Sequence, residues 1–279
     1  MSELLELGKN ACDAKYVLQK LTTEEKNKAL QTAANDLCER QEEILAANVL
    51  DLENGKNNGM NPGLLDRLKL TGERIAQIAE GLRQIAALPD CIGETMEHFE
   101  RPNGLKIDKV RVPLGVIGII YEARPNVTAD AFGLCFKTGN AVILKGGSDA
   151  IHSNIAIVKV LQDALEACSM PRTAVQLIED TDRAVTAQFM KMKEYVDVLI
   201  PRGGAGLIRS VVENARVPVI QTGVGVCHIY VHERADLDMA ARILYNAKTS
   251  RPSVCNAAEC VLVDRAAARG FLSLARERL

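Results

Sequence analysis

The sequence of 279 residues contains no tryptophan, and aromatic residues make up only 4% of it. A surface that stacks single-stranded nucleic-acid bases depends on aromatic side chains, so this composition disfavours one. The 34 basic and 36 acidic residues give a net charge of -2 and form no long run of either sign. Neither nucleic acid nor an anionic membrane is therefore an expected partner, and we expect a small-molecule substrate.

The sequence also lacks any stretch approaching the roughly 18 apolar residues that a membrane helix needs. Its N-terminus carries acidic residues and a lysine instead of the apolar core of a signal peptide, which predicts a cytoplasmic protein. Eight cysteines are scattered without a Cys-x-x-Cys pair, and there are four histidines. Neither a metal site nor a disulfide framework is indicated. The 47% hydrophobic content predicts a globular chain of one large or two ordinary domains.

The first ninety residues predict a layer of helices. Thr22 and Glu25 fit a capping box, which predicts a helix running from there to about Asn54 and Gly55. Alternating segments on either side of Asn103-Gly104 then predict a two-stranded hairpin over residues 93–113. Such a ribbon either serves subunit association through its unpaired edges or is covered within the chain, and both readings remain open.

Beyond Pro113 the pattern becomes repeated strand and helix units. Continuous apolar strands at 115–120, 141–144, 175–178 and 196–200 alternate with helical segments. This alternation predicts an α/β fold with a parallel sheet covered on both faces. In such sheets ligands bind at the carboxyl ends of the strands, so the loops there are the candidate site.

The loop after the first of these strands contains Arg124 and Asn126. The Asn126 amide is a candidate donor to a developing oxyanion, and Arg124 a candidate partner for a carboxylate or phosphate. The alternative is structural: a helix cap at Asn126 and a surface ion pair at Arg124.

Two further loops indicate a nucleotide. In the segment 145–148, Lys145 is placed to reach a ribose or phosphate, and Gly147 and Ser148 follow it without an acidic residue, which leaves room for the 2′-phosphate of NADP. The segment 201–206 includes Gly203 and Gly204 before a predicted helix, whose amides suit a diphosphate. Each glycine-rich loop alone is weak evidence, but three loops at three strand ends of one sheet favour a nucleotide site.

Cys255 is the candidate nucleophile. It follows a helical segment that breaks at Pro252, and Lys248 and Arg251 lie just before it. Nearby cations stabilise the thiolate, which is the form that attacks. The alternative is a buried cysteine that packs as a small hydrophobic residue.

Five segments together carry a resemblance to a known family. They are 112–118 (VPLGVIG), 121–128 (YEARPNVT), 199–207 (LIPRGGAGL), 225–231 (GVCHIYV) and 246–256 (NAKTSRPSVCN). In their order the chain resembles the γ-glutamyl phosphate reductases, also called glutamate-5-semialdehyde dehydrogenases, of the aldehyde dehydrogenase superfamily. The resemblance implies a Rossmann-type parallel sheet with N-terminal helices in residues 1–232, binding NADP, and the start of a second α/β catalytic domain in residues 233–279.

The same resemblance implies a reaction and its residues. Cys255 would attack L-glutamyl 5-phosphate to form a thioester, with the oxyanion held by Asn126 and the Cys255 amide. NADPH would then supply the hydride that gives L-glutamate 5-semialdehyde, in proline biosynthesis. Arg124, Arg251 and Lys248 are the expected substrate anchors. Lys145, Gly147, Ser148, Gly203 and Gly204 are the expected cofactor contacts.

Hydrolytic aldehyde dehydrogenases resemble this chain around Gln221, but they carry a glutamate there that activates water. A glutamine cannot act as this base, which favours reduction over aldehyde oxidation. Members of the resembled family continue well beyond the position of Leu279, so the resemblance implies an incomplete catalytic domain here. The alternatives are a cofactor-binding fragment without catalysis and an aldehyde dehydrogenase with another substrate. A homo-oligomer and functional coupling to glutamate 5-kinase are further expectations from the resemblance.

Overall fold

The computed structural model describes residues 2–122, 124–223, 225–252 and 254–279. The chain divides into two compact units, Met1–Thr222 and Gly223–Leu279. This division lies ten residues before the sequence-based boundary at 232 and assigns the strand Cys227–Val231 to the second unit. The hydrophobic clusters agree with it, because Val231 packs in the core of the second unit.

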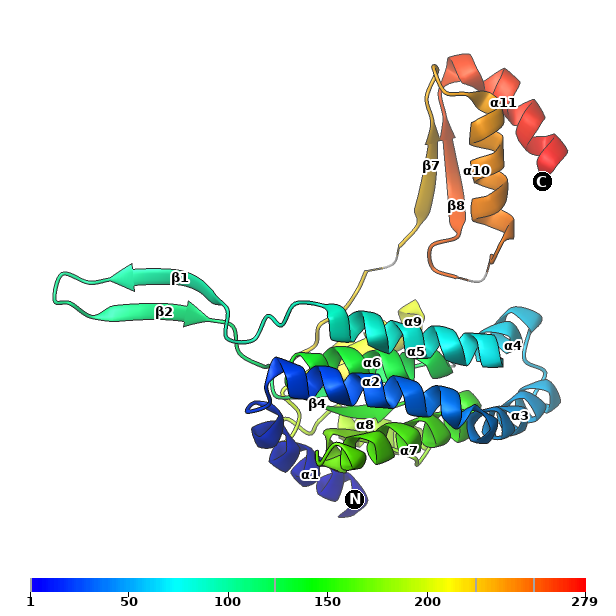
Figure 1. The fold of residues 1–279 in the computed structure, drawn as a ribbon. Coiled ribbons are helices and arrows are strands. Elements are labelled where there is room, and N and C mark those ends of the chain that lie inside the picture. The colour runs from blue at the N-terminus through cyan, green and yellow to red at the C-terminus, as the bar shows by residue number, and fades with distance from the viewer. Residues whose placement is uncertain (1, 123, 224, 253) are drawn as a thin grey trace. The chain divides into compact units, whose positions relative to one another are not determined.

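Helices form the N-terminal part of the first unit, as the sequence predicts (Figure 1). They are α1 (Ser2–Leu18), α2 (Thr23–Glu39), α3 (Gln41–Asn57), α4 (Pro62–Leu68) and α5 (Gly72–Ala87). The capping box that starts α2 is confirmed: the Thr22 hydroxyl accepts from the Glu25 amide, and the Glu25 carboxylate accepts from the Thr22 amide. The single long helix predicted after it is wrong, because the chain leaves helical geometry at Arg40, between α2 and α3.

The predicted hairpin is present as β1 (Thr95–Glu100) and β2 (Lys106–Val110), an antiparallel pair. Gly104 in its turn has a φ of 83°, which a glycine adopts without strain. All residues of both strands are exposed within the chain, Phe99 and Ile107 among them. The described residues of the first unit therefore do not cover the hairpin.

Four parallel strands in the order β5-β4-β3-β6 form the sheet of the first unit. The strands are β3 (Val116–Tyr121), β4 (Ala141–Lys145), β5 (Val175–Leu177) and β6 (Val198–Arg202). The helices that alternate with them are α6 (Pro125–Lys137), α7 (Ile151–Ala167), α8 (Arg183–Phe189) and α9 (Ala205–Asn214), with short 3-10 turns η1 (Ser148–Ala150) and η2 (Arg172–Ala174). The predicted α/β fold with a parallel sheet is confirmed.

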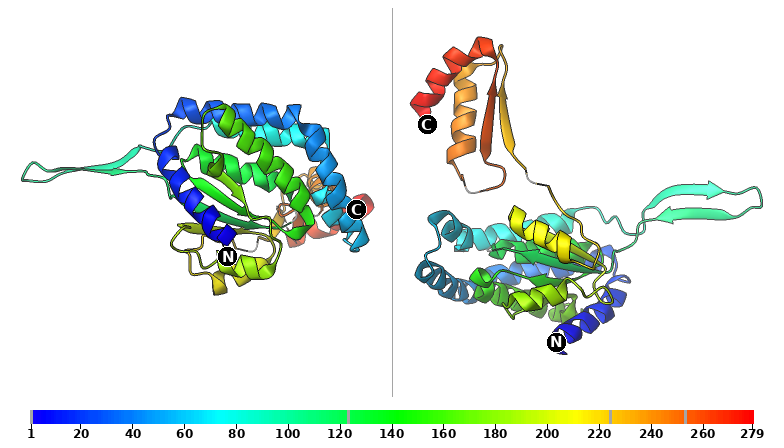
Figure 2. Two further views of the ribbon diagram at one scale, coloured as in Figure 1. Left: turned by 90° about the horizontal axis from the view of Figure 1, so that it is seen from below. Right: turned by 180° about the vertical axis from the view of Figure 1, so that it is seen from behind.

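The sheet lies between two helical layers (Figure 2). One layer has α6 and α7, with α2, α3 and α5 packed on them, and the other has α1, α8 and α9. Every residue of β3 and β4 is buried, which accounts for the apolar runs 116–120 and 141–144. The core continues into the helices through residues such as Phe132 and Phe136 of α6. This packing fixes the carboxyl ends of β3, β4 and β6 at one edge of the sheet.

The second unit contains β7 (Cys227–Val231), α10 (Leu237–Thr249), β8 (Ala258–Val263) and α11 (Arg265–Arg278). The two strands pair in parallel, and α10 and α11 pack through a small core that includes Leu244 and Phe271. The turn between α10 and β8 carries Cys255. Among the described residues no helix has the length and apolar character needed to cross a membrane.

Candidate active site

The loop after β3 places Arg124 and Asn126 at the start of α6. Arg124, and not Asn126, is the N-cap residue, and Pro125 occupies the first turn, where its missing N–H is tolerated. The cap interpretation of Asn126 is therefore wrong. Asn126 is exposed, and its Nδ2 donates to the Asp130 carboxylate at 3.1 Å, one helical turn further on. Burial raises the pKa of Asp130, and the hydrogen bond from Asn126 partly offsets this rise.

Lys145 ends β4 as a buried lysine, 4% exposed, whose Nζ donates to the Gly146 carbonyl at 3.0 Å. Burial lowers the pKa of Lys145, and the charge of Asp180 partly offsets this decrease. Gly147 follows in extended conformation as the cap of η1, and Ser148 is exposed. A contact from Lys145 to a ribose or phosphate therefore requires its side chain to turn outward.

A buried chain of hydrogen bonds lies beneath these loops, and the sequence did not reveal it. The Tyr121 hydroxyl pairs with the Thr128 hydroxyl at 2.8 Å, which in turn donates to Asn154 Oδ1 at 2.9 Å. These side chains connect β3, α6 and α7. A Cβ added at Gly146 would lie 2.3 Å from Asn154 Nδ2, so only glycine allows this close approach.

The N-terminus of α9 carries the predicted glycines, and Glu122 reaches it from the end of β3. The Gly204 amide donates to Glu122 Oε2 at 3.0 Å. A carboxylate at this position is stabilised by the partial positive charge of the helix N-terminus. Glu122 was not identified from the sequence. The strand order would have indicated it, because β3 and β6 are parallel neighbours with Tyr121 opposite Arg202, which places Glu122 beside the loop that follows β6.

The fit of a dinucleotide to the sheet edge at the carboxyl ends of β3, β4 and β6 depends on the glycines at the start of α9. A Cβ at Gly206 would meet no atom within 4 Å, so the first turn of α9 is open beside the Gly204 amide. Exposed amides at a helix N-terminus suit a diphosphate, provided that the Glu122 carboxylate moves aside. On these observations the residues present fit a dinucleotide.

Cys255 lies in the exposed turn between α10 and β8 of the second unit. All eight cysteines lie in the described residues, and Cys255 alone among them is exposed. The interpretation of Cys255 as a buried packing residue is therefore wrong. Lys248, in the last turn of α10, donates from Nζ to the Ala258 carbonyl at 3.0 Å, and Arg251 is exposed before the thiol.

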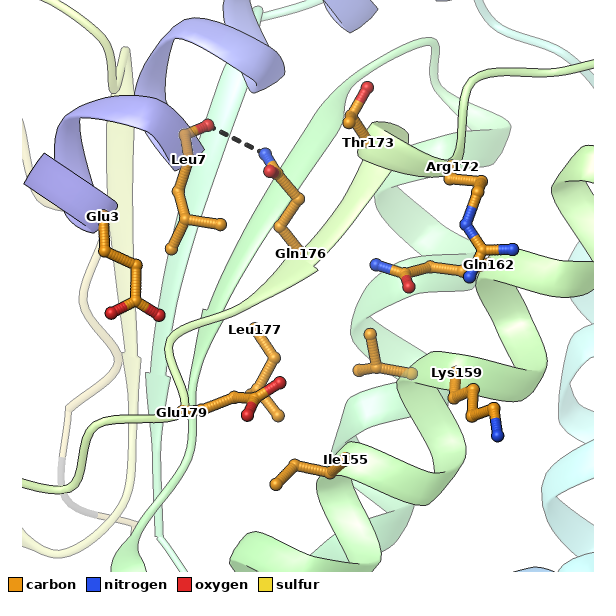
Figure 3. Close-up of a pocket in the computed structure, with 11 residues that line it drawn as sticks. Glu3, Leu7, Ile155, Lys159, Gln162, Arg172, Thr173, Gln176, Leu177 and Glu179 are labelled. Carbon is orange, nitrogen blue, oxygen red and sulfur yellow. Dashed lines mark hydrogen bonds between the residues drawn. The ribbon is translucent and has the colours of Figure 1, made fainter.

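A cavity of about 480 Å³ lies elsewhere, between α1, α7, η2 and β5 (Figure 3). Leu7 and Ile155 contribute apolar wall, Lys159 and Glu179 contribute charge, and Gln176 Nε2 donates across to the Leu7 carbonyl at 2.8 Å. None of the predicted site residues lines it. Among the described residues there is also no cluster of histidine, cysteine and carboxylate side chains that would hold a metal ion.

The chain matches the aldehyde dehydrogenase family model over residues 3–279. The chain belongs to the aldehyde dehydrogenase family. This match covers both units, including all the predicted site residues.

Two curated relatives are named γ-glutamyl phosphate reductase. The chain is 60% identical over 271 residues to the γ-glutamyl phosphate reductase of Heliobacterium modesticaldum, which covers 97% of this chain and 65% of the relative. Against the γ-glutamyl phosphate reductase of Clostridium perfringens it is 54% identical, with 100% and 67% covered. The chain thus spans about two thirds of the length of these relatives.

A solved structure agrees with this similarity. The crystal structure of γ-glutamyl phosphate reductase from Thermotoga maritima superimposes with a TM-score of 0.88 at 46% identity, covering 99% of this chain and 66% of that one. The resemblance found in the sequence and the aldehyde dehydrogenase-like fold predicted from it are both confirmed.

Proposed function

We propose that this chain carries out the NADPH-dependent reduction of L-glutamyl 5-phosphate to L-glutamate 5-semialdehyde, with release of phosphate, in proline biosynthesis. The relatives named γ-glutamyl phosphate reductase, 54 to 60% identical over nearly the whole chain, support this reaction. Within the structure, the observation that carries the proposal is the exposed thiol of Cys255.

Cys255 is the proposed nucleophile. Its sulfur attacks the acyl carbon, the bond to the phosphate oxygen breaks, and a thioester forms on the protein. Asn126 is the proposed donor to the oxyanion. Its amide nitrogen has two N–H groups, so the bond to Asp130 leaves one for this purpose.

Arg124, Arg251 and Lys248 are the proposed anchors for the phosphate and the α-carboxylate of the substrate. Lys248 already donates to the Ala258 carbonyl, but an ammonium group has three N–H donors. It can therefore hold the turn and an anion at once. Gln221, which is exposed, has no carboxylate to activate water, so the thioester is not hydrolysed by this residue.

NADPH, the proposed cofactor, supplies the hydride that reduces the thioester carbonyl. Once the Glu122 carboxylate moves off the Gly204 amide, Gly203 and Gly204 would leave the N-terminal amides of α9 open to its diphosphate. Lys145, Gly147 and Ser148 would face its adenosine ribose, and the absence of an acidic residue at 145–148 favours a 2′-phosphate there.

The experiment is a direct absorbance assay of the reverse reaction, with L-glutamate 5-semialdehyde, NADP⁺ and inorganic phosphate. We expect NADPH formation that depends on phosphate and is abolished by Cys255→Ser. Cys260→Ser is the matched control, because Cys260 lies in β8 and is half-buried. NADPH formation without phosphate, or full activity in Cys255→Ser, would contradict the proposal.

A second candidate is dinucleotide binding without turnover. It is favoured by the first unit, which contains a four-stranded sheet with helices on both faces, whereas the described residues of the second unit form two strands and two helices. Calorimetric titration of the chain with NADPH separates the candidates. Binding together with an inactive reverse assay supports the second one, and turnover excludes it.

We also propose that the chain acts in the cytoplasm, associates with copies of itself and couples functionally to glutamate 5-kinase. The exposed hairpin supports association, because its outer edges have unpaired main-chain groups.

A further inference from the structure

Cys227 opens β7, and its thiol contacts the turn that carries Cys255. Its Sγ donates to the main-chain oxygen of Cys255 at 3.3 Å. A carbonyl oxygen lies about 2.4 Å from the Cα of its own residue, so the Cys227 sulfur is within about 6 Å of the Cys255 Cα. A cysteine sulfur lies about 2.8 Å from its own Cα, so the Cα atoms of Cys227 and Cys255 are at most about 8.5 Å apart. Disulfides join residues whose Cα atoms are about 4.4 to 6.8 Å apart, so a movement of the exposed turn by about 2 Å or less brings the two residues into this range.

Two features fix this proximity within the second unit. Cys227 pairs directly with Ala258, the first residue of β8, and the register shifts between Cys227 and His228. Lys248 Nζ holds the end of α10 against the Ala258 carbonyl. Both ends of the turn are thus anchored beside Cys227, while Cys255 itself is exposed.

The two thiols differ in access to solvent. Cys255 is exposed, so an oxidant in solution reaches its sulfur first, whereas Cys227 is half-buried. Cys260 is also half-buried, but it lies in β8 opposite His228 in the strand register. The contact to the Cys255 turn therefore singles out Cys227 from its neighbour.

We propose that Cys255 is an oxidation site and that Cys227 is its resolving thiol. A hydroperoxide oxidises the Cys255 thiolate: an S–O bond forms, the O–O bond breaks, and an alcohol or water leaves, giving a sulfenic acid. The Cys227 sulfur then attacks the Cys255 sulfur, the S–O bond breaks, and water leaves with the thiol proton, giving a disulfide.

This disulfide protects Cys255 from oxidation to the sulfinic acid, which is not reversed by thiols. A dithiol reductant restores both cysteines by thiol–disulfide exchange. The step requires no turnover by the protein, so it is independent of the proposed function.

The test treats the full 279-residue chain with one equivalent of hydrogen peroxide, alkylates the remaining thiols and maps disulfides by mass spectrometry. Cleavage after Glu259 separates Cys255 from Cys260. We expect a peptide pair linked through Cys227 and Cys255 that disappears after dithiothreitol. Cys260→Ser should form the same link.

Trapping with dimedone, which reacts with sulfenic acids, gives the second measurement. In Cys227→Ser the sulfenic acid has no resolving partner, so labelling of Cys255 should rise at least about fivefold over the unsubstituted chain and over Cys260→Ser. Circular dichroism shows whether each variant is folded. Equal labelling in Cys227→Ser, or a dominant link from Cys255 to Cys260 or to a second chain, would overturn the proposal.

Discussion

Gly115, the residue before β3, is expected to tolerate no side chain. Its φ is 121°, a region that other residues enter only with strain of about 1 to 3 kcal/mol. A Cβ at this position would lie 2.1 Å from Asp197 Oδ2. That oxygen accepts the Val116 amide at 2.7 Å and contacts Lys15 Nζ at 3.1 Å, so Gly115→Ala must displace it from both.

The expected loss of stability follows from these contacts. A hydrogen bond to a charged group contributes about 1.5 to 3 kcal/mol, and the partly exposed ion pair with Lys15 contributes little. Together with the backbone strain, Gly115→Ala should lower the free energy of unfolding by about 3 to 5 kcal/mol. For a slope of about 2 kcal/mol per molar urea, the unfolding midpoint falls by about 2 M.

Far-UV circular dichroism is the appropriate probe for this urea titration, because the chain has no tryptophan. Gly206→Ala is the matched control, since a Cβ there would meet nothing within 4 Å and alanine is favoured in a helix, so it should leave stability unchanged or raise it by up to about 1 kcal/mol. If Gly115→Ala loses less than about 1 kcal/mol, the Asp197 contact does not hold the start of β3 as argued.

Three further outcomes are expected. Glu122→Gln removes a competing charge from the N-terminus of α9, so it should tighten the binding of inorganic pyrophosphate, measured by calorimetry, about twofold to fivefold. Glu213→Gln, at the other end of α9, is the control and should leave the affinity unchanged. Equal affinities of the two variants would contradict this. Burial lowers the pKa of Lys145 below its ordinary 10.5, so the unfolded chain takes up this proton first as the pH falls. The free energy of unfolding of the unsubstituted chain, relative to that of Lys145→Met, should therefore rise from pH 7.5 to 10.5. A difference that does not change with pH would contradict the burial argument. Replacing 95–110 by a short glycine-serine linker should abolish self-association in sedimentation velocity, and an unchanged sedimentation coefficient would exclude the hairpin as the contact.

The sequence by itself determined the local elements. The capping box at Thr22 and the turn at Gly104 depend on contacts between near neighbours in the chain, and the apolar runs of the strands can be read in the sequence without knowing their partners. The order of the loop segments was also enough to indicate the family, because it needs no distances. The helix break at Arg40 was missed, since the apolar pattern continues across it and Arg40 forms ion pairs with Glu43 of α3 and with Asp163 of α7.

Only the tertiary structure decided which side chains meet at the strand ends. Glu122 and Gly204 are 82 residues apart in sequence and come together because β3 and β6 are neighbours. Whether Lys145 is buried or exposed likewise depends on the packing around β4. Cys255 was marked by its sequence as a candidate nucleophile. Its exposure, and the contact with Cys227 across 28 positions, became visible only in the fold, because both depend on the parallel pairing of β7 with β8.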